Sequence, residues 1–240
     1  MADEVLKLAD VSLALGEGAK RVNALVGINL AVAEGEMVSV TGRSGSGKSS
    51  LLNVAGGLLP ADVGSVAVAG ESLDPSRPAQ RAKVRRKSIG YVFQSADLVP
   101  HLTVGENVAL PLELVGLSPK EGAERAAEAL ERVGGSDWFA RRPDHLSGGQ
   151  QQLVAIARGI VGERSLLIAD EPTGALDDLT GEHIARLLRD LADSGTAVLL
   201  ATHDQTLAGW ADRVIRLRDG RIANVTERVD PDPDLVPSMR

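Results

Sequence analysis

MVSVTGRSGSGKSS, residues 37–50, joins an apolar run to a glycine-rich loop and then to the start of a helical segment. The loop, Gly42 to Ser49, fits the spacing G-x-x-x-x-G-K-[ST] and directly follows the apolar run, as this motif requires. Its glycines let successive backbone N–H groups point at phosphate oxygens, and the N-terminus of the next helix adds partial positive charge. The stretch therefore predicts an α/β domain in which a strand, a phosphate-binding loop and a helix follow one another.

The loop also predicts which residues contact a nucleotide. Lys48 is expected to neutralise the β- and γ-phosphates, and the hydroxyl group of Ser49 is expected to bind Mg²⁺. ATP and Mg²⁺ are the predicted ligands. The residues predicted to bind the phosphates are Gly42, Arg43, Ser44, Gly45, Ser46, Gly47, Lys48, Ser49 and Ser50.

Short runs of valine, isoleucine and leucine alternate with glycine-rich turns and helical patterns along the rest of the chain. This alternation is typical of a parallel sheet that helices cover on both faces. Because ligands of such sheets bind beyond the carboxyl ends of the strands, the residues that follow each run are candidate site residues. The predicted strands are Met37 to Thr41, Ile89 to Phe93, Ser165 to Ala169 and Ala197 to Thr202.

Helix and turn signals organise the remaining sequence. A capping box followed by a proline predicts a helix that starts at Ser118, and a second amphipathic helix is expected after Thr180. Asp219-Gly220 lies between two apolar runs and predicts a β-hairpin. The charged, proline-containing stretch 224–240 is expected to be a poorly ordered tail.

Composition excludes several classes of protein. The 240-residue chain has no cysteine, so it offers neither disulfides nor thiolate ligands. Its formal net charge of −7 argues against a general polyanion binder. No run reaches about 18 apolar residues, and acidic residues stand where a secretion signal carries basic ones, so neither a membrane span nor export is expected.

One local cluster has the opposite charge. Its basic residues are Arg77, Arg81, Lys83, Arg85, Arg86 and Lys87. Such a run usually forms a solvated face, which is the reading that the sequence favours. Contact with anionic lipid headgroups or with a membrane partner is the alternative.

A second motif follows in a helical region. Residues 146–150 read LSGGQ and precede a helical run to Gly162. Ser147 is a good helix N-cap, and the two glycines after it leave backbone N–H groups open to an anion. Together with the phosphate-binding loop, or P-loop, this sequence resembles the ATPase subunits of ABC transporters, whose signature motif it matches.

The resemblance implies that the chain works as a homodimer. In ABC ATPases the signature motif covers the nucleotide that is bound by the P-loop of the opposing subunit, so a single copy is expected to be weakly active at best. The segment 175–177 resembles the D-loop, which crosses between subunits. By this resemblance, the residues at the partner's site are Ser147, Gly148, Gly149 and Gln150, and Asp177 has a coupling role.

Four further residues match motifs that surround the triphosphate in this family. Asp170 and Glu171 follow an apolar run as the Walker B carboxylates do, which implies that Asp170 holds Mg²⁺ and Glu171 activates the attacking water. His203 matches the switch histidine and Gln94 the Q-loop glutamine. The resemblance thus implies catalytic roles for Lys48, Gln94, Glu171 and His203, and metal binding by Ser49, Gln94 and Asp170.

The resemblance covers about Leu6 to Ile222 and implies an α/β fold, a P-loop NTPase parallel-sheet core with an N-terminal antiparallel β portion and an inserted helical subdomain. Residues 1–94 and 160–223 are expected to form the nucleotide-binding core, and residues 95–159 the helical subdomain. The implied partners are a second copy of the chain and integral membrane permease subunits, with no nucleic acid. The chain is then expected to be cytoplasmic and peripheral on the inner face of the cell membrane.

Within the family, the sequences at 171–177 and 56–58 look most like the group that serves lipoprotein release, macrolide export and antimicrobial-peptide resistance. The chain departs from the family at one position. An aromatic ring usually lies upstream of the P-loop and stacks on adenine, but Ser12 to Leu25 contains none, and Leu15 is nearest by spacing. Lost stacking implies weaker ATP binding or a weaker preference for ATP over GTP.

Two other functions stay open from the sequence. One is an ABC ATPase that acts on DNA or ribosomes, and the other is a nucleotide-gated scaffold of a membrane complex. The single cassette and the compact helical region favour the transporter ATPase over the first alternative. Glu171 and His203 argue against a scaffold that does not hydrolyse nucleotide.

Overall fold

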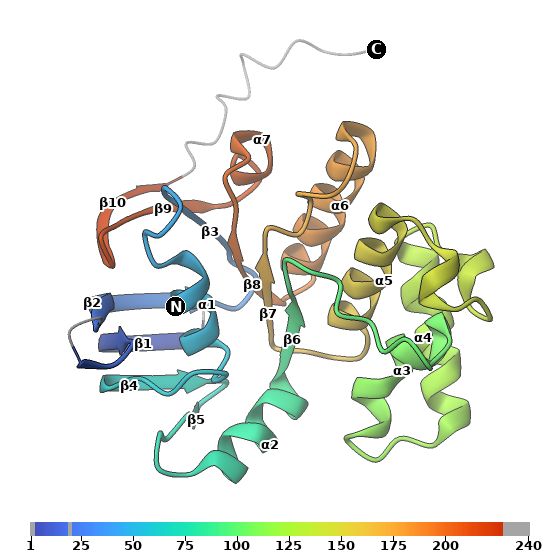
Figure 1. Ribbon diagram of the computed structural model, residues 1–240, viewed down its shortest axis with the longest axis horizontal. Coiled ribbons are helices and arrows are strands. Elements are labelled where there is room, and N and C mark those ends of the chain that lie inside the picture. The colour runs from blue at the N-terminus through green and yellow to red at the C-terminus, as the bar shows by residue number, and fades with distance from the viewer. Residues whose placement is uncertain (1–2, 19–20, 228–240) are drawn as a thin grey trace.

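Two β-sheets and a set of helices build the molecule in the computed structural model, which describes residues 3–18 and 21–227 (Figure 1). The strands are β1 (Glu4–Leu15), β2 (Val22–Ala33), β3 (Met37–Thr41), β4 (Val63–Val68), β5 (Glu71–Ser72), β6 (Ile89–Val92), β7 (Leu166–Asp170), β8 (Ala197–Ala201), β9 (Arg213–Arg218) and β10 (Arg221–Glu227). The helices are α1 (Lys48–Ala55), α2 (Pro78–Ser88), α3 (Val104–Glu113), α4 (Pro119–Arg132), α5 (Gly148–Ile160), α6 (Asp178–Asp193) and α7 (Gln205–Ala208).

The larger sheet has six strands in the order β10-β9-β3-β8-β7-β6. The strands from β9 to β6 run parallel, and only β10 is antiparallel to its neighbour. Every residue of β7 and β8 is buried, because helices cover both faces. Leu167 packs into the apolar cluster beside α5 and α6, whereas Leu166 packs into the cluster beside α1. The four predicted strands and the predicted parallel core are confirmed.

The smaller sheet is antiparallel, with the order β2-β1-β4-β5. Alternate residues of β1, among them Leu6 and Leu8, are buried against the α1 side of the molecule. Helix α1 contacts β7 and β8 of the larger sheet and β2 of the smaller one. The helix that follows the P-loop therefore lies between the two sheets, and the expected N-terminal antiparallel portion is confirmed.

Helices α3, α4 and α5 lie together on the right of Figure 1, beside the edge strand β6. Each begins with a capping box, in which an N-cap hydroxyl accepts from the N3 amide while the N3 side chain accepts from the N-cap amide. The box at Ser118 is the predicted one. The other two start at Thr103 and Ser147.

Two predicted boundaries differ from the structure by three residues or more. Helix α6 starts at Asp178, before Thr180, because the carboxylate of Asp177 accepts from the Thr180 amide and caps it. The tail predicted from residue 224 is wrong at its beginning, since β10 stays paired with β9 as far as Glu227. The rest of that prediction, residues 228–240, lies outside the described residues. The predicted hairpin at Asp219-Gly220 is confirmed, with both residues at positive φ.

Across residues 3–18 and 21–227, no helix combines the length and the apolar character that crossing a bilayer needs.

Candidate functional site

The P-loop connects β3 to α1 at the carboxyl edge of the larger sheet. Gly47 caps α1 with φ 104°, and Gly42 has φ 156°. A Cβ atom at Gly47 would collide with the carbonyl oxygen of Ala24, and one at Gly42 with the carbonyl oxygen of Leu217. Glycine is required at both positions by close backbone approach, which explains why the loop can wrap so tightly.

The ammonium group of Lys48 points back into this loop. Its Nζ atom donates to the carbonyl oxygen of Gly42 at 2.9 Å and lies 3.4 Å from that of Arg43. The buried hydroxyl of Ser46 has no hydrogen-bond partner among the described residues. The loop thus holds a cation beside a helix N-terminus, which is a favourable arrangement for an anion.

Predicted site residues from four separate parts of the chain line one cavity beside the P-loop. The cavity has a volume of about 460 Å³ and brings together Lys48, Ser49, Ser50, Gln94, Asp170, Glu171 and His203. Parallel strands β3, β6, β7 and β8 all end at this edge, so residues far apart in the sequence converge there. The structure brings together these predicted residues, although their roles stay predictions.

Asp170 is the last residue of β7 and is 9% exposed. Burial raises the pKa of its carboxyl group, the hydrogen bond with Ser49 lowers it, and the neighbouring Glu171 raises it again. A buried carboxylate in contact with a hydroxyl at the mouth of a phosphate-binding loop suits a hard cation, since Mg²⁺ prefers oxygen donors. The donor set therefore fits the metal that the sequence predicts.

Glu171 and His203 both line the cavity and are in direct contact with each other. The Nδ1 atom of His203 lies 2.8 Å from Glu171 Oε2, and the backbone N–H of His203 donates to the same oxygen at 3.3 Å. Glu171 has φ 48°, an uncommon conformation for a residue with a side chain, and its amide donates to the carbonyl of Ala201 at 2.9 Å. This carboxylate is 13% exposed, whereas the imidazole is 76% exposed. The pair thus has a fixed carboxylate and an imidazole within reach of solvent.

Gln94 is exposed just beyond β6, and α5 holds the backbone around it. Gln152 donates to the carbonyl of Phe93 at 3.2 Å, and Arg158 donates to the carbonyls of Ala96 and Asp97 at 2.7 Å and 2.9 Å. The segment that carries Gln94 is therefore coupled to α5, the helix that begins with the signature motif.

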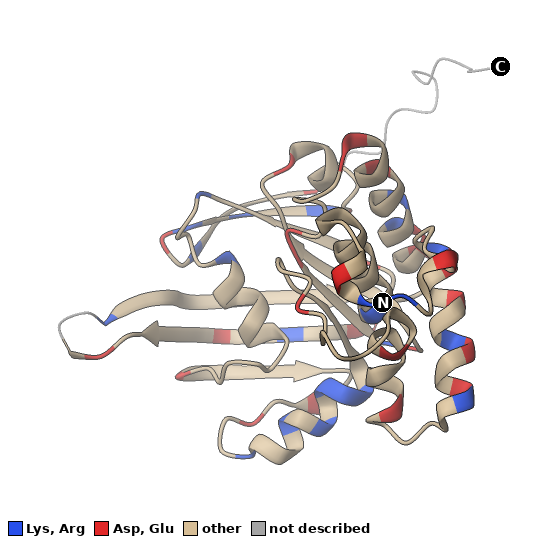
Figure 2. Cartoon of the chain, turned by 45° about the vertical axis from the view of Figure 1, so that its right-hand side comes forward, with Lys and Arg blue, Asp and Glu red and all other residues tan. Residues whose placement is uncertain are grey.

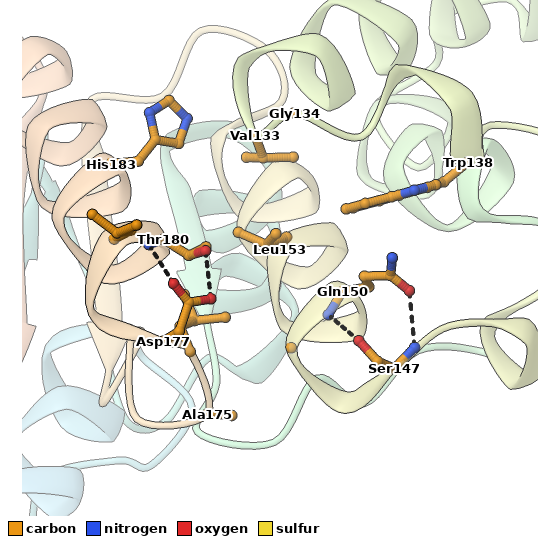
Figure 3. A pocket seen from close by; sticks show the side chains of 13 residues that line it. Val133, Gly134, Trp138, Ser147, Gln150, Leu153, Ala175, Asp177, Thr180 and His183 are labelled. Atoms are coloured by element: carbon orange, nitrogen blue, oxygen red, sulfur yellow. Dashed lines mark hydrogen bonds between the residues drawn. The ribbon is translucent and has the colours of Figure 1, made fainter.

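The signature motif itself lies in a different cavity, of about 630 Å³ (Figure 3). Ser147 caps α5, accepting from the Gln150 amide at 3.3 Å, while Gln150 accepts from the Ser147 amide at 3.0 Å. Gly149 also lines this cavity, and the position of a Cβ atom on Gly148 has no atom within 4 Å. Ser147 and Gly148 are exposed, whereas Gly149 and Gln150 are half-buried.

Asp177 lies across the same cavity from the signature motif (Figure 3). Its carboxylate bonds to the hydroxyl and the amide of Thr180 at 2.7 Å and 3.0 Å, and these hydrogen bonds lower its pKa. None of the residues that line this cavity lines the P-loop cavity. Within one chain, the two groups of predicted site residues are separate.

Sequence reasoning missed three residues of the P-loop cavity, Val22, Asn23 and Ala24. Leu15 and Val22 are direct cross-strand partners in β1 and β2, both line the cavity, and they are 41% and 65% exposed. Leu15 was predicted from its spacing, but Val22 was not. Val22 lies opposite Leu15 because of the register between β1 and β2, and no motif in the sequence indicates this register. This part of the cavity thus offers two branched aliphatic side chains and, within residues 3–18 and 21–227, no Phe, Tyr or Trp ring.

Comparisons with known proteins identify relatives over most of the chain. A family model described as ABC transporter matches residues 25–174. The macrolide export ATP-binding/permease protein MacB of Shigella flexneri is 43% identical over 218 residues, 91% of this chain but only 34% of that protein. The chain therefore spans about a third of the length of these relatives. An uncharacterized ABC transporter ATP-binding protein of Thermotoga maritima is 43% identical over 94% of this chain and 96% of its own length.

Solved structures with the same fold are also similar in sequence. A dimeric structure of a post-hydrolysis state of the ATP-binding cassette MJ0796, bound to ADP and Pi, has a TM-score of 0.89 at 38% identity, covering 93% of this chain and 99% of that one. CbiO1 of Clostridium perfringens, part of the ABC transporter complex cbiONQ, has a TM-score of 0.81 at 30% identity, covering 94% and 89%. These relatives do not favour an action on DNA or ribosomes.

Proposed function

Because this chain belongs to the ABC transporter family of ATP-binding proteins, we propose that two copies of it close around two ATP molecules and that hydrolysis drives a separate membrane permease. One observation carries the proposal: the cavity with the P-loop and the cavity with the signature motif share no residue. A second copy supplies the missing half, since its exposed Ser147 turn can cover the phosphates bound at Lys48. Each ATP then lies between two chains.

The residues of the P-loop cavity divide the work on ATP. Lys48 exchanges its bonds to the loop carbonyls for bonds to the β- and γ-phosphates, and the loop amides hold the same oxygens. Glu171 orients the attacking water and takes its proton as the water attacks the γ-phosphorus in line with the leaving oxygen. His203, freed from Glu171, donates to the γ-phosphate. Binding of the triphosphate thus replaces the hydrogen bonds that Lys48 and His203 make to other residues of the site.

Ser49, Gln94 and Asp170 are the residues that would hold Mg²⁺. When bound, the ion neutralises charge on the transferring phosphate oxygens. The hydroxyl of Ser49, the amide oxygen of Gln94 and the carboxylate of Asp170 would supply the oxygen donors that hold the ion and its water shell. Gln94 therefore connects the reacting end of ATP with the segment that α5 holds.

A groove of about 290 Å³ beside Gln94 is where we place the permease contact. It is lined by the stacked rings of Tyr91 and Phe93 and by Arg158 and Arg164. A permease segment in this groove would feel any movement of Gln94, because Arg158 contacts both the groove and the Gln94 segment. The macrolide export relatives, whose name joins ATP-binding to permease, favour such a partner. The chain is then peripheral on the inner face of the cell membrane.

Replacing Glu171 with Gln tests this proposal. The variant should bind ATP but lower turnover by roughly 10²-fold or more, because an amide cannot accept the proton of the attacking water. It should therefore accumulate as an ATP-bound dimer, measured by light scattering, and copurify with a permease from membranes. Lys48→Ala is the control, since it should lose the ATP-dependent dimer. A strictly monomeric Glu171→Gln chain with ATP, or the recovery of ribosomes or DNA, would contradict the proposal.

A further inference from the structure

The helix α2 carries an unusual concentration of positive charge for an acidic protein. Its eleven residues contain five arginines and lysines and no acid, and Arg77 precedes it, whereas the whole chain has a net charge of −7. Figure 2 shows this helix at the lower edge of the molecule, banded by basic residues. The ATPase site uses none of these residues.

Two of the arginines hold the helix to the rest of the molecule. Arg81 donates to the carbonyl of Pro75 at 2.8 Å, and Arg85 donates to the carbonyl of Gly57 at 2.8 Å. Burial and the neighbouring arginines lower the pKa of Arg85. These two side chains have a structural role. The side chains on the opposite side of the helix do not take part in these contacts.

The outward face of α2 is formed by Lys83, Arg86 and Lys87. They follow the i, i+3, i+4 spacing that puts side chains on one side of a helix, and all three are exposed, whereas Val84 and Ser88 are buried. Lys87 lies 3.5 Å from Glu71, a pair exposed by 70% and 41%. Among the described residues, neither Lys83 nor Arg86 has a carboxylate within salt-bridge distance. The face is cationic and only partly neutralised.

This face adjoins the groove in which we place the permease. Arg164 lines that groove and donates to the carbonyls of Arg86 and Lys87 at the end of α2. When a permease occupies the groove, α2 lies beside that contact. Because the permease is embedded in the bilayer, α2 is then close to the bilayer surface. Anionic headgroups on that surface attract basic residues by about 1 kcal/mol each.

We propose that Lys83, Arg86 and Lys87 form a second, electrostatic contact with anionic phospholipid headgroups next to the permease. The location of this contact beside a permease rests on the proposed function. The attraction to anionic headgroups depends only on the basic residues of α2. Nucleic acid is a poorer match, because α2 has no aromatic residue to stack on bases and the chain is acidic overall.

Sedimentation with lipid vesicles tests the contact on the purified full chain. Vesicles with about a third of phosphatidylglycerol should bind several-fold more protein than pure phosphatidylcholine vesicles at about 30 mM salt, and the excess should vanish near 300 mM. The triple variant Lys83→Glu, Arg86→Glu, Lys87→Glu should lower the binding at least about tenfold. Its ATP turnover should stay unchanged, because none of the three residues lines the P-loop cavity.

A matched control reverses the same number of charges on another helix. Lys120, Arg125 and Arg132 are exposed on α4, so their change to Glu should leave vesicle binding largely intact. Equal loss in both triple variants would overturn the proposal, since it would reflect net charge alone. Unchanged vesicle binding in the α2 variant, with loss of the permease instead, would assign the face to protein. Retention by single-stranded DNA without vesicle binding would assign it to nucleic acid. Failure of ATP hydrolysis in the wild-type chain would count against the proposed function, not this contact.

Discussion

At the scale of single residues, the P-loop cavity combines polar phosphate chemistry at one end with an aliphatic pair at the other. The phosphate end is specified by glycines that no other residue could replace and by Lys48. At the opposite end, Leu15 and Val22 are branched side chains without a ring, and none of the described residues that line the cavity is Phe, Tyr or Trp. Contact with the base then relies on dispersion and apolar burial, without aromatic stacking.

The change Leu15→Tyr should therefore tighten ATP binding. An aromatic contact contributes about 1 kcal/mol beyond its area, which corresponds to roughly a fivefold lower Kd for ATP. Competition against a fluorescent nucleotide measures this Kd. Val63→Tyr is the control, because Val63 is also an exposed strand residue, 56% exposed, but does not line the cavity. An unchanged Kd in Leu15→Tyr would mean that the base lies elsewhere.

At the scale of elements, α5 serves two purposes at once. Its N-terminus is a capping box that stabilises the helix, and the same turn carries the glycine pair Gly148 and Gly149 that lies beside the signature cavity. Helix α4 starts with the same box at Ser118 but has no glycine pair and lies outside the signature cavity. A comparison of the two helices therefore distinguishes the contribution of an N-cap to stability from the contribution of Ser147 to the proposed site.

Changing each cap serine to Ala should separate the two effects. Ser147→Ala and Ser118→Ala should each cost about 1 kcal/mol of unfolding free energy, because both remove an N-cap acceptor. Only Ser147→Ala should also lower ATP turnover, while leaving the Kd for ATP unchanged, since the proposed dimer puts Ser147 at the nucleotide of the partner. Chemical denaturation and steady-state kinetics measure the two quantities. Equal turnover in both variants would remove Ser147 from the site.

At the scale of the whole molecule, the proposed function uses the separation of the two cavities, because a second copy would complete each of them. One chain has the P-loop, Glu171 and His203 on one cavity, and Ser147 and Asp177 on another. A symmetric dimer supplies both halves to two sites at once, because each copy gives its signature turn and receives that of the other. Activity then belongs to the pair of chains.

Mixing two inactive variants tests this arrangement. Dimers of Lys48→Ala or of Ser147→Ala alone have no intact site and should show strongly reduced turnover, but their heterodimer has one site with an intact P-loop and an intact signature turn. An equal mixture should therefore recover up to about a quarter of wild-type turnover. A mixture of Lys48→Ala with Glu171→Gln should recover none, because both residues line the same cavity and no heterodimer site is intact. Equal recovery in the two mixtures would contradict a site shared between chains.

The sequence by itself determined the parallel core, the P-loop and the helix that caps at Ser118, because each depends on local chemistry: apolar period, glycine at close backbone contacts, and a hydroxyl three residues before a carboxylate. It also located Asp170, Glu171 and His203 at strand ends, where a parallel sheet gathers them. The misplaced start of the tail shows the limit of this reasoning, since composition cannot reveal that residues 224–227 pair with β9.

Only the tertiary structure decided which residues meet. Leu15 and Val22 become neighbours through the register of β1 and β2, the bond between Glu171 and His203 joins the ends of β7 and β8, and α2 is fixed beside the groove by Arg164. The separation of the signature turn from the P-loop likewise depends on how the helices pack on the sheet. Contacts between distant residues follow from pairing and packing of whole elements, and no local pattern encodes them.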